Sequence, residues 1–255
     1  MKFRKELDLA RSMAMHAGEL ATGYQTRGVT PEEKDDLSPV TIADKEAEKL
    51  MVARIREMFP DDGILGEEGA DQPSRNGRRW ILDPIDGTRD FVRGMPFWST
   101  LIGFEVDGVV EMGVCHMQCR GEQFSAVRGE GAWLNEKPIH ISDITSASQS
   151  VACISGINNA RVLPFRNGLL DWVEQFWSVR SMGGCLDACW LAQGKAELWL
   201  EPTAKPWDLA PLKIIIEEAG GKFINFDGGS SIYGGNGIGY VPALEAVVRD
   251  LLART

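Results

Sequence analysis

A short segment, Asp83-Pro84-Ile85-Asp86-Gly87-Thr88, combines two carboxylates with a hydroxyl directly after the apolar run Trp80-Ile81-Leu82. Two more carboxylates, Glu67 and Glu68, lie between glycines a short way upstream. Oxygen ligands at this density suit hard divalent cations such as Mg²⁺, which take carboxylates, carbonyls and water. The segment is therefore a candidate metal site.

The backbone chemistry of the segment favours convergence of its oxygen atoms. Asp83 is expected to end a buried strand, Pro84 removes a backbone donor and Gly87 permits a sharp turn. The turn would bring Asp83, the Ile85 carbonyl and Asp86 to one side. A capped turn without a metal would explain the segment alone equally well. Repulsion between Asp83 and the nearby glutamate pair would be costly unless a cation or solvent screened it, which makes the metal site harder to dismiss.

A further acid, Asp208, stands far downstream at the start of a predicted helix. Apolar residues at helical spacing follow it, up to the stop at Gly220-Gly221. A carboxylate at this place is favoured as a helix cap and by the helix dipole. A helix N-terminus can also hold a phosphate, so local chemistry leaves both roles open for Asp208.

Together these motifs resemble the inositol monophosphatase superfamily of Mg²⁺-dependent, lithium-sensitive phosphatases. The resemblance covers nearly the whole chain and is carried by the segments 39–44, 66–69, 80–91 and 207–221. It implies a layered α-β-α-β-α sandwich of the inositol monophosphatase and fructose-1,6-bisphosphatase type. It also implies a homodimer that hydrolyses a small-molecule phosphate monoester with a metal-activated water.

The resemblance assigns the metal ligands residue by residue. Two or three Mg²⁺ ions, with Mn²⁺ as an alternative, would be held by Glu67, Asp83, the Ile85 carbonyl, Asp86 and Asp208. Glu67 counts among the catalytic residues as well. Two metal ions can lower the pKa of a bound water and neutralise developing negative charge, so the reaction needs no histidine or cysteine nucleophile.

The remaining catalytic roles also follow from the resemblance. Asp44 and Thr88 would pair to orient or activate the attacking water, and the backbone amides of Gly87 and Thr88 would cradle the phosphate. Glu68 would stabilise the metal ligands without binding a metal itself. Lys34 resembles a lysine on a loop that closes over the metals.

The substrate prediction depends on three places in the chain. The segment 91–102 resembles the histidinol-phosphate phosphatase branch more than the inositol enzymes. Glu201 would contact a substrate hydroxyl or the histidinol ammonium, and the ammonium would give the stronger, charge-assisted bond. Gly184 stands where that branch has an acid, which Asp187 could replace from the next turn. Asp86 would complete the substrate-binding set.

These observations favour a phosphomonoesterase acting on L-histidinol phosphate. The alternatives are myo-inositol 1-phosphate and the phosphates of a sugar or nucleotide. A noncatalytic regulator that binds a metal or phosphate is a hypothesis of a different class, disfavoured because every acid the mechanism needs is present.

Composition limits the other possibilities. A chain of 255 residues is long enough for one large or two small domains, and we expect halves at 1–150 and 151–255. The net charge of −10 argues against nucleic acid or an anionic membrane as partner. The chain has no transmembrane-length apolar run and no apolar signal core at its N-terminus, so a cytoplasmic protein is expected. The two Cys-x-x-x-Cys pairs, Cys115/Cys119 and Cys185/Cys189, are expected to be buried thiols rather than zinc ligands, and the odd total of five cysteines argues against a disulfide framework.

The elements that must position these residues follow from apolar periodicity and turn signals. Helices are predicted at 3–24, 43–58, 165–177, 184–193, 208–219 and 242–252. Strands are predicted at 79–83, 99–106, 109–116, 122–127, 151–155, 196–200, 222–226 and 238–241, and the turn at 129–131 leads into 132–135. Hairpins come first and alternation later, which is typical of an α+β half followed by an α/β half.

Overall fold

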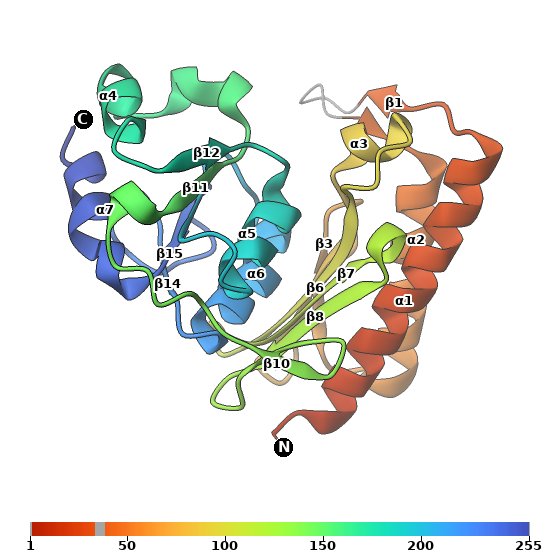
Figure 1. Cartoon of the computed structure of the whole chain (residues 1–255). Helices are drawn as coiled ribbons and strands as arrows, with labels where there is room; N and C mark the ends of the chain where they lie inside the picture. Colours follow the sequence, from red (N-terminus) through yellow and green to blue (C-terminus); the bar gives the residue numbers. More distant parts are fainter. Residues whose placement is uncertain (1, 34–38, 255) are drawn as a thin grey trace.

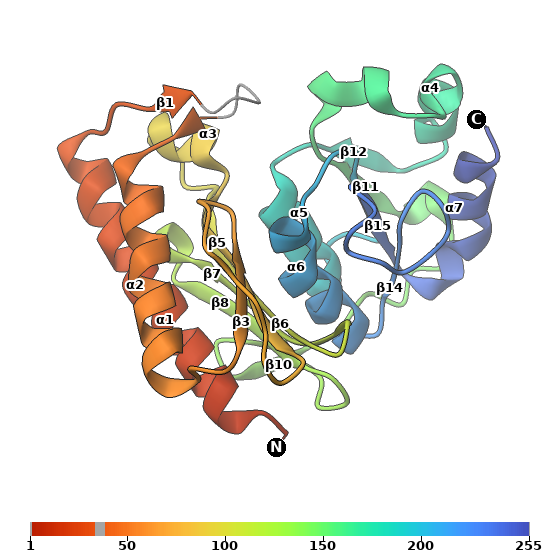
Figure 2. The same ribbon diagram turned by 180° about the vertical axis from the view of Figure 1, so that it is seen from behind.

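Helices and β-sheets alternate in five layers across the molecule (Figure 1). The computed structural model describes residues 2–33 and 39–254. From one side to the other, the layers are α1 (Arg4–Arg27) with α2 (Ile42–Met58), a large sheet, α5 (Gly184–Ala192) with α6 (Pro206–Glu218), a smaller sheet, and α4 (Leu169–Val173) with α7 (Glu245–Leu252). The view from behind shows the same order (Figure 2). This is the α-β-α-β-α sandwich expected from the sequence.

The large sheet has eight strands in the order β10-β9-β8-β7-β6-β5-β3-β4. Their bounds are β3 (Gly63–Gly66), β4 (Asp71–Gln72), β5 (Arg78–Asp86), β6 (Ser99–Val106), β7 (Val109–Met117), β8 (Glu122–Val127), β9 (Ala132–Leu134) and β10 (Lys137–Ile139). Only β3 and β5 pair in parallel. The predicted hairpin around Asp107-Gly108 is confirmed, and both turn residues have the positive φ typical of a two-residue hairpin loop.

The smaller sheet has five strands in the order β12-β11-β13-β15-β14. Their bounds are β11 (Val151–Ile154), β12 (Ser178–Arg180), β13 (Leu198–Glu201), β14 (Lys222–Ile224) and β15 (Gly237–Tyr240). The neighbours of β11 are parallel to it, whereas β15 is antiparallel to both of its partners. The strands therefore form a mixed sheet with helices on both faces.

Several short elements complete the described chain. They are β1 (Glu32–Glu33), β2 (Pro39–Val40), α3 (Thr88–Val92) and the 3₁₀ turns η1 (Gln118–Arg120), η2 (Ala147–Gln149), η3 (Ile157–Val162), η4 (Arg166–Gly168) and η5 (Pro242–Leu244). None of the helices in the described part of the chain is both long and apolar enough to cross a membrane.

Two glycines allow α6 to lie directly on the large sheet. Gly103 of β6 and Gly113 of β7 face each other in the strand register. A Cβ at Gly103 would lie 2.7 Å from the Cβ of Ala210, and one at Gly113 would lie 2.7 Å from the Pro211 backbone. Any larger residue would push the helix away, because protein interiors are close-packed. This close contact sets the distance between α6 and the large sheet, and with it the position of Asp208.

The structure corrects two of the predicted elements. The helix predicted at 165–177 is only the turn η4 followed by α4. Phe165, Leu169, Trp172 and Phe176 are all buried, so the apolar spacing was real, but Gly168 separates η4 from α4 and favours helix poorly. The strand predicted to end at Asp83 continues to Asp86. The other predicted elements are present with ends shifted by a few residues.

The predicted division into halves at residue 150 stays a prediction. The two sheets do separate between β10 and β11. However, α6 comes from the second half of the chain and packs against strands of both sheets.

Candidate active site

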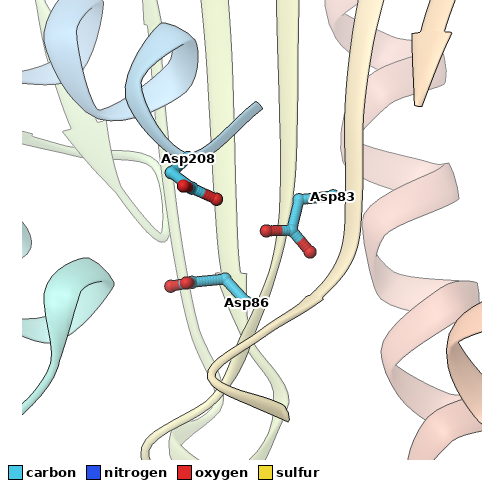
Figure 3. A group of neighbouring side chains, drawn as sticks. All are labelled: Asp83, Asp86 and Asp208. Carbon is cyan, nitrogen blue, oxygen red and sulfur yellow. The ribbon is translucent and has the colours of Figure 1, made fainter. Parts of the chain in front are cut away.

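Three carboxylates from two distant segments converge on one point. Asp83 and Asp86 come from the end of β5, and Asp208 comes from the first turn of α6 (Figure 3). One oxygen atom from each carboxylate lies within 4.8 Å of the others. Oδ1 of Asp83 is buried and has no hydrogen-bond partner among the described residues. An orphaned carboxylate oxygen beside two other carboxylates is the donor set that a hard divalent cation requires.

A β-bulge makes the two aspartates of β5 face the same way. Asp83 pairs with Leu101 and Asp86 with Ser99, so two residues of β5 stand opposite the single residue Thr100. In a regular strand residues three apart point to opposite faces, and the extra residue restores a common face. The Thr100 hydroxyl donates to the carbonyl of Pro84 at 2.9 Å and holds the bulge.

Burial and mutual repulsion make the acidic cluster costly when it is ionised. Burial, with the charges of Glu67, Asp86 and Asp208, raises the pKa of Asp83 well above its ordinary value. Burial raises the pKa of Asp86 to about 6, although a hydrogen bond with Cys185 opposes the shift. Burial and the charge of Asp86 raise the pKa of Asp208 to about 7. Positive charge at this point would relieve the repulsion, so these residues fit a bound divalent metal.

Asp208 also caps the helix on which it lies. It is the third residue of α6, and its carboxylate accepts a hydrogen bond of 2.7 Å from the backbone N–H of Lys205. The capping bond holds the side chain at the point where α6 meets the large sheet. The two roles that the sequence left open for Asp208, helix cap and site residue, are thus compatible.

Asp44 has the same placement at the start of α2. It is the third residue of that helix, and its Oδ2 atom accepts hydrogen bonds from the backbone N–H and the hydroxyl of Thr41 at 2.8 and 2.6 Å. The other oxygen, Oδ1, lies 3.5 Å from the hydroxyl oxygen of Thr88. That hydroxyl donates to the Ile85 carbonyl at 3.1 Å. Burial raises the pKa of Asp44, which makes it a better proton acceptor.

A cavity of about 480 Å³ opens above these residues. Its lining contains five of the residues singled out in the sequence besides Asp208, namely Glu67, Asp83, Asp86, Gly87 and Thr88, together with the Ile85 backbone position. Gly87 precedes α3 and has a φ of 87°, a left-handed backbone conformation that glycine adopts without strain. Sequence reasoning missed Asn158, Ser181 and Met182, which also line the cavity and carry no recognisable local pattern.

A smaller cavity of about 140 Å³ continues from Asp86 and Asp208 toward Glu201. Burial and the charges of Asp208 and Asp86 raise the pKa of Glu201 to about 8. Gly184 lines the same cavity, and a Cβ there would lie 3.1 Å from Oε2 of Glu201. The missing side chain at Gly184 therefore leaves room beside the Glu201 carboxylate.

Asp187 lies away from both cavities. Its side chain is fully buried, and its carboxylate accepts hydrogen bonds from the backbone N–H groups of Met182 and Gly183. It thus holds the turn before α5 through these backbone hydrogen bonds. Among the other predicted residues, Glu68 lies in the loop beside Glu67, and Lys34 lies outside the described residues.

Comparison with known proteins identifies the family. The model of the inositol monophosphatase family matches residues 4–253. The chain belongs to the inositol monophosphatase family. A histidinol-phosphatase of Chlorobaculum parvum is 38% identical, over 97% of this chain and 95% of the relative. A protein of Pasteurella multocida named Nus factor SuhB is 32% identical, over 96% of this chain and 94% of the relative.

Solved structures of the family agree with the fold. A Thermotoga maritima IMPase superposes with a TM-score of 0.88 at 29% sequence identity, covering 98% of this chain and 97% of the other. The predicted family and fold are confirmed. As a member of the inositol monophosphatase family the protein is a metal-dependent phosphomonoesterase, and its substrate is a phosphate monoester.

Proposed function

We propose that this phosphatase hydrolyses L-histidinol phosphate to L-histidinol and phosphate with Mg²⁺. The observation that carries the proposal is the Glu201 carboxylate, which lines the small cavity next to Asp86 and Asp208. L-histidinol carries an ammonium group, whose positive charge would lower the raised pKa of Glu201 and favour its ionised form. An ionised carboxylate binds an ammonium more strongly than a hydroxyl because both partners are charged. The similarity to the Chlorobaculum parvum histidinol-phosphatase supports the same substrate.

The acidic cluster would hold the metal ions. Glu67, Asp83, Asp86, Asp208 and the Ile85 carbonyl supply the ligands that Mg²⁺ prefers, with Mn²⁺ as an alternative, and we propose two or three ions. When bound, such ions act as Lewis acids toward the phosphate oxygens and increase the acidity of a bound water. Bound metal ions would also reverse the local potential, which an anionic substrate needs when it enters an acidic cavity of a protein with a net charge of −10.

Asp44 and Thr88 would orient the attacking water and remove its proton. The Thr88 hydroxyl carries one proton and lies between two acceptors, the Ile85 carbonyl and Oδ1 of Asp44. A water that donates to the Thr88 oxygen would direct its lone pair at phosphorus, while the Thr88 proton moves to Asp44. Thr41 fixes the second Asp44 oxygen, so only Oδ1 is available for this transfer.

The phosphate would lie against the backbone amides of Gly87 and Thr88. Both residues line the larger cavity at the point where α3 begins. Backbone N–H groups at a helix start point toward the ligand and favour an anion there. The alcohol portion would then extend past Asp86 toward Glu201.

A comparison of substrates tests the proposal. We expect a higher kcat/KM for L-histidinol phosphate than for myo-inositol 1-phosphate, fructose 1,6-bisphosphate and a nucleotide monophosphate. Glu201→Gln removes the charge but keeps the shape, and it should lower kcat/KM for L-histidinol phosphate more than for the uncharged alcohols. Equal or better turnover of myo-inositol 1-phosphate by the wild-type protein would overturn the assignment of the alcohol, although not that of the reaction.

Two further properties are part of the same proposal. The protein is expected to be a homodimer, which sedimentation velocity would test at micromolar concentration. It is also expected to be inhibited by lithium in the presence of Mg²⁺, as the resemblance to lithium-sensitive phosphatases implies.

A further inference from the structure

Glu48 is a buried carboxylate that lies behind the active site. It is located on α2 one helical turn after Asp44, and its exposed fraction is 5%. Its Oε2 atom accepts a hydrogen bond from the backbone N–H of Glu68 at 2.8 Å, and its Oε1 atom accepts one from Ala70 at 2.9 Å. Both carboxylate oxygens therefore bind the loop that follows β3.

This loop carries Glu67 and is held at several points. The Glu67 N–H donates to the Leu82 carbonyl of β5 at 3.1 Å, and the Gly66 N–H donates to the Ala70 carbonyl at 2.7 Å. A Cβ at Gly66 would overlap the Glu48 carboxylate. The glycine thus lets the loop lie directly on α2, and Glu48 fixes the backbone immediately after Glu67.

Electrostatic repulsion acts against this arrangement. Burial raises the pKa of Asp83, Asp86 and Asp208, and the Glu67 charge adds to each shift, so Glu67 repels the three aspartates. Without an opposing restraint the loop would lower its energy by moving Glu67 outward. The two hydrogen bonds from backbone N–H groups to an ionised carboxylate are of the stronger, charge-assisted kind. They oppose the outward movement from the side away from the cavity.

We infer that Glu48 is a positioning residue, which holds Glu67 in place for divalent-metal binding through the Glu68 and Ala70 backbone. The inference rests on the proposed metal role of Glu67. Glu48 is not among the residues that line the larger cavity, so it acts through the loop. Because Asp44 and Glu48 are one turn apart, α2 links the water-orienting carboxylate to the metal-binding loop as a rigid unit.

Glu48→Gln tests the inference with little change in shape. The amide keeps one acceptor oxygen but presents its NH₂ group to the second backbone N–H, so one hydrogen bond is lost. We expect the Kd for Mn²⁺, measured by calorimetry on metal-free protein, to rise about 10- to 100-fold, as is usual when a residue that orients a metal ligand is changed. Half-saturation of hydrolysis by Mg²⁺ should rise in parallel, whereas excess Mg²⁺ should restore most of kcat.

Two more variants make the result specific. Glu48→Asp keeps the charge but is too short to reach both N–H groups, so it should weaken Mn²⁺ binding as well, even if the glutamine variant folds poorly. Glu57→Gln is the matched control, because Glu57 is an exposed residue on the last turns of the same helix. Its Mn²⁺ affinity should equal that of the wild type.

The outcomes separate this inference from the proposed function. If Glu48→Gln and Glu48→Asp bind Mn²⁺ as tightly as a wild type that does bind it, Glu48 has no positioning role, even if both variants unfold more easily. If the wild type binds no Mn²⁺, or Asp83→Asn binds it equally well, then the proposed metal site itself is wrong.

Discussion

Neutralising one acid of the cluster should stabilise the metal-free protein. The perturbation is Asp86→Asn, which keeps the shape of the side chain and removes its charge. Burial raises the pKa of Asp86 from 3.8 to about 6. A pKa difference of one unit corresponds to about 1.4 kcal/mol, so ionised Asp86 opposes folding by about 3 kcal/mol. We expect the variant to gain up to about this much stability at pH 8 in EDTA.

The effect should depend on pH in a defined direction. Below about pH 4 the carboxyl is protonated in the folded and the unfolded chain, so it contributes no difference. As the pH rises, the unfolded chain loses the proton first and the folded wild type becomes less stable. The loss is complete above about pH 6, where the carboxyl is ionised in both states. The variant lacks this group, so the difference between the two proteins should grow from about pH 4 to 6 and then level off toward pH 8.

Urea unfolding followed by tryptophan fluorescence measures the effect, because the chain has eight tryptophans. The wild type and the variant are compared at pH 4, 6 and 8 in EDTA, and again in excess Mg²⁺. Mg²⁺ should reverse their order, because it binds the intact cluster of the wild type and stabilises the folded state by mass action. Asp8→Asn, at an exposed position on α1, is the matched control and should show neither effect.

A metal-free Asp86→Asn protein that is no more stable than the wild type at pH 8 would refute this reasoning. It would mean that solvent or protons already relieve the repulsion within the cluster. Repulsion among the carboxylates of the cluster would then be no reason to expect a metal there, although the family relationship would not be affected.

Two other predictions concern the site and the helix that completes it. Asp83→Asn should abolish hydrolysis and the Mg²⁺-dependent rise in stability, since Asp83 is the most buried of the carboxylate ligands. Retained turnover of a phosphate ester in a continuous phosphate-release assay would contradict the proposed mechanism. Gly113→Ala should destabilise the protein by about 1–3 kcal/mol in urea unfolding, because the new Cβ would lie 2.6 Å from Cγ2 of Ile214 and 2.7 Å from the Pro211 backbone. Gly113→Ala should also weaken Mg²⁺ binding by displacing α6. The control Gly23→Ala on α1, where a new Cβ would meet only the end of the Arg27 side chain at 4.0 Å, should be neutral or slightly stabilising. Equal stability of the two variants would show that the close contact of α6 is dispensable.

The sequence alone was sufficient for the chemistry that depends on residue type and local spacing. The segment from Asp83 to Thr88, with Glu67, pointed to a divalent-metal site, and its resemblance to the inositol monophosphatase superfamily implied a metal-dependent phosphatase, which the family match confirms. The helix start at Asp208 was also readable, because a carboxylate near the first turn has a local capping function. The layered α-β-α-β-α fold followed from the resemblance to the inositol monophosphatase superfamily.

Other features of the site could not be read from local patterns. The helix predicted at 165–177 is interrupted at Gly168, although its apolar residues are buried at helical spacing, because apolar spacing alone does not fix where a helix begins and ends. Asp187 appeared able to replace the acid missing at Gly184, but it lines neither cavity and accepts hydrogen bonds from the Met182 and Gly183 backbone instead. Glu48 drew no attention, although its spacing from Asp44 placed both on one face of α2.

What only the tertiary structure decided is how these groups meet. Asp83 and Asp86 face the same side because β5 carries one more residue than β6 between two paired positions. Asp208 reaches them because Gly103 and Gly113 let α6 touch the sheet. Both features depend on contacts between segments far apart in the chain, and the energy of such contacts is absent from any local stretch of sequence. The residue types therefore determine which ion and reaction suit this protein, and the packing of β5, β6 and α6 determines that the ligands converge.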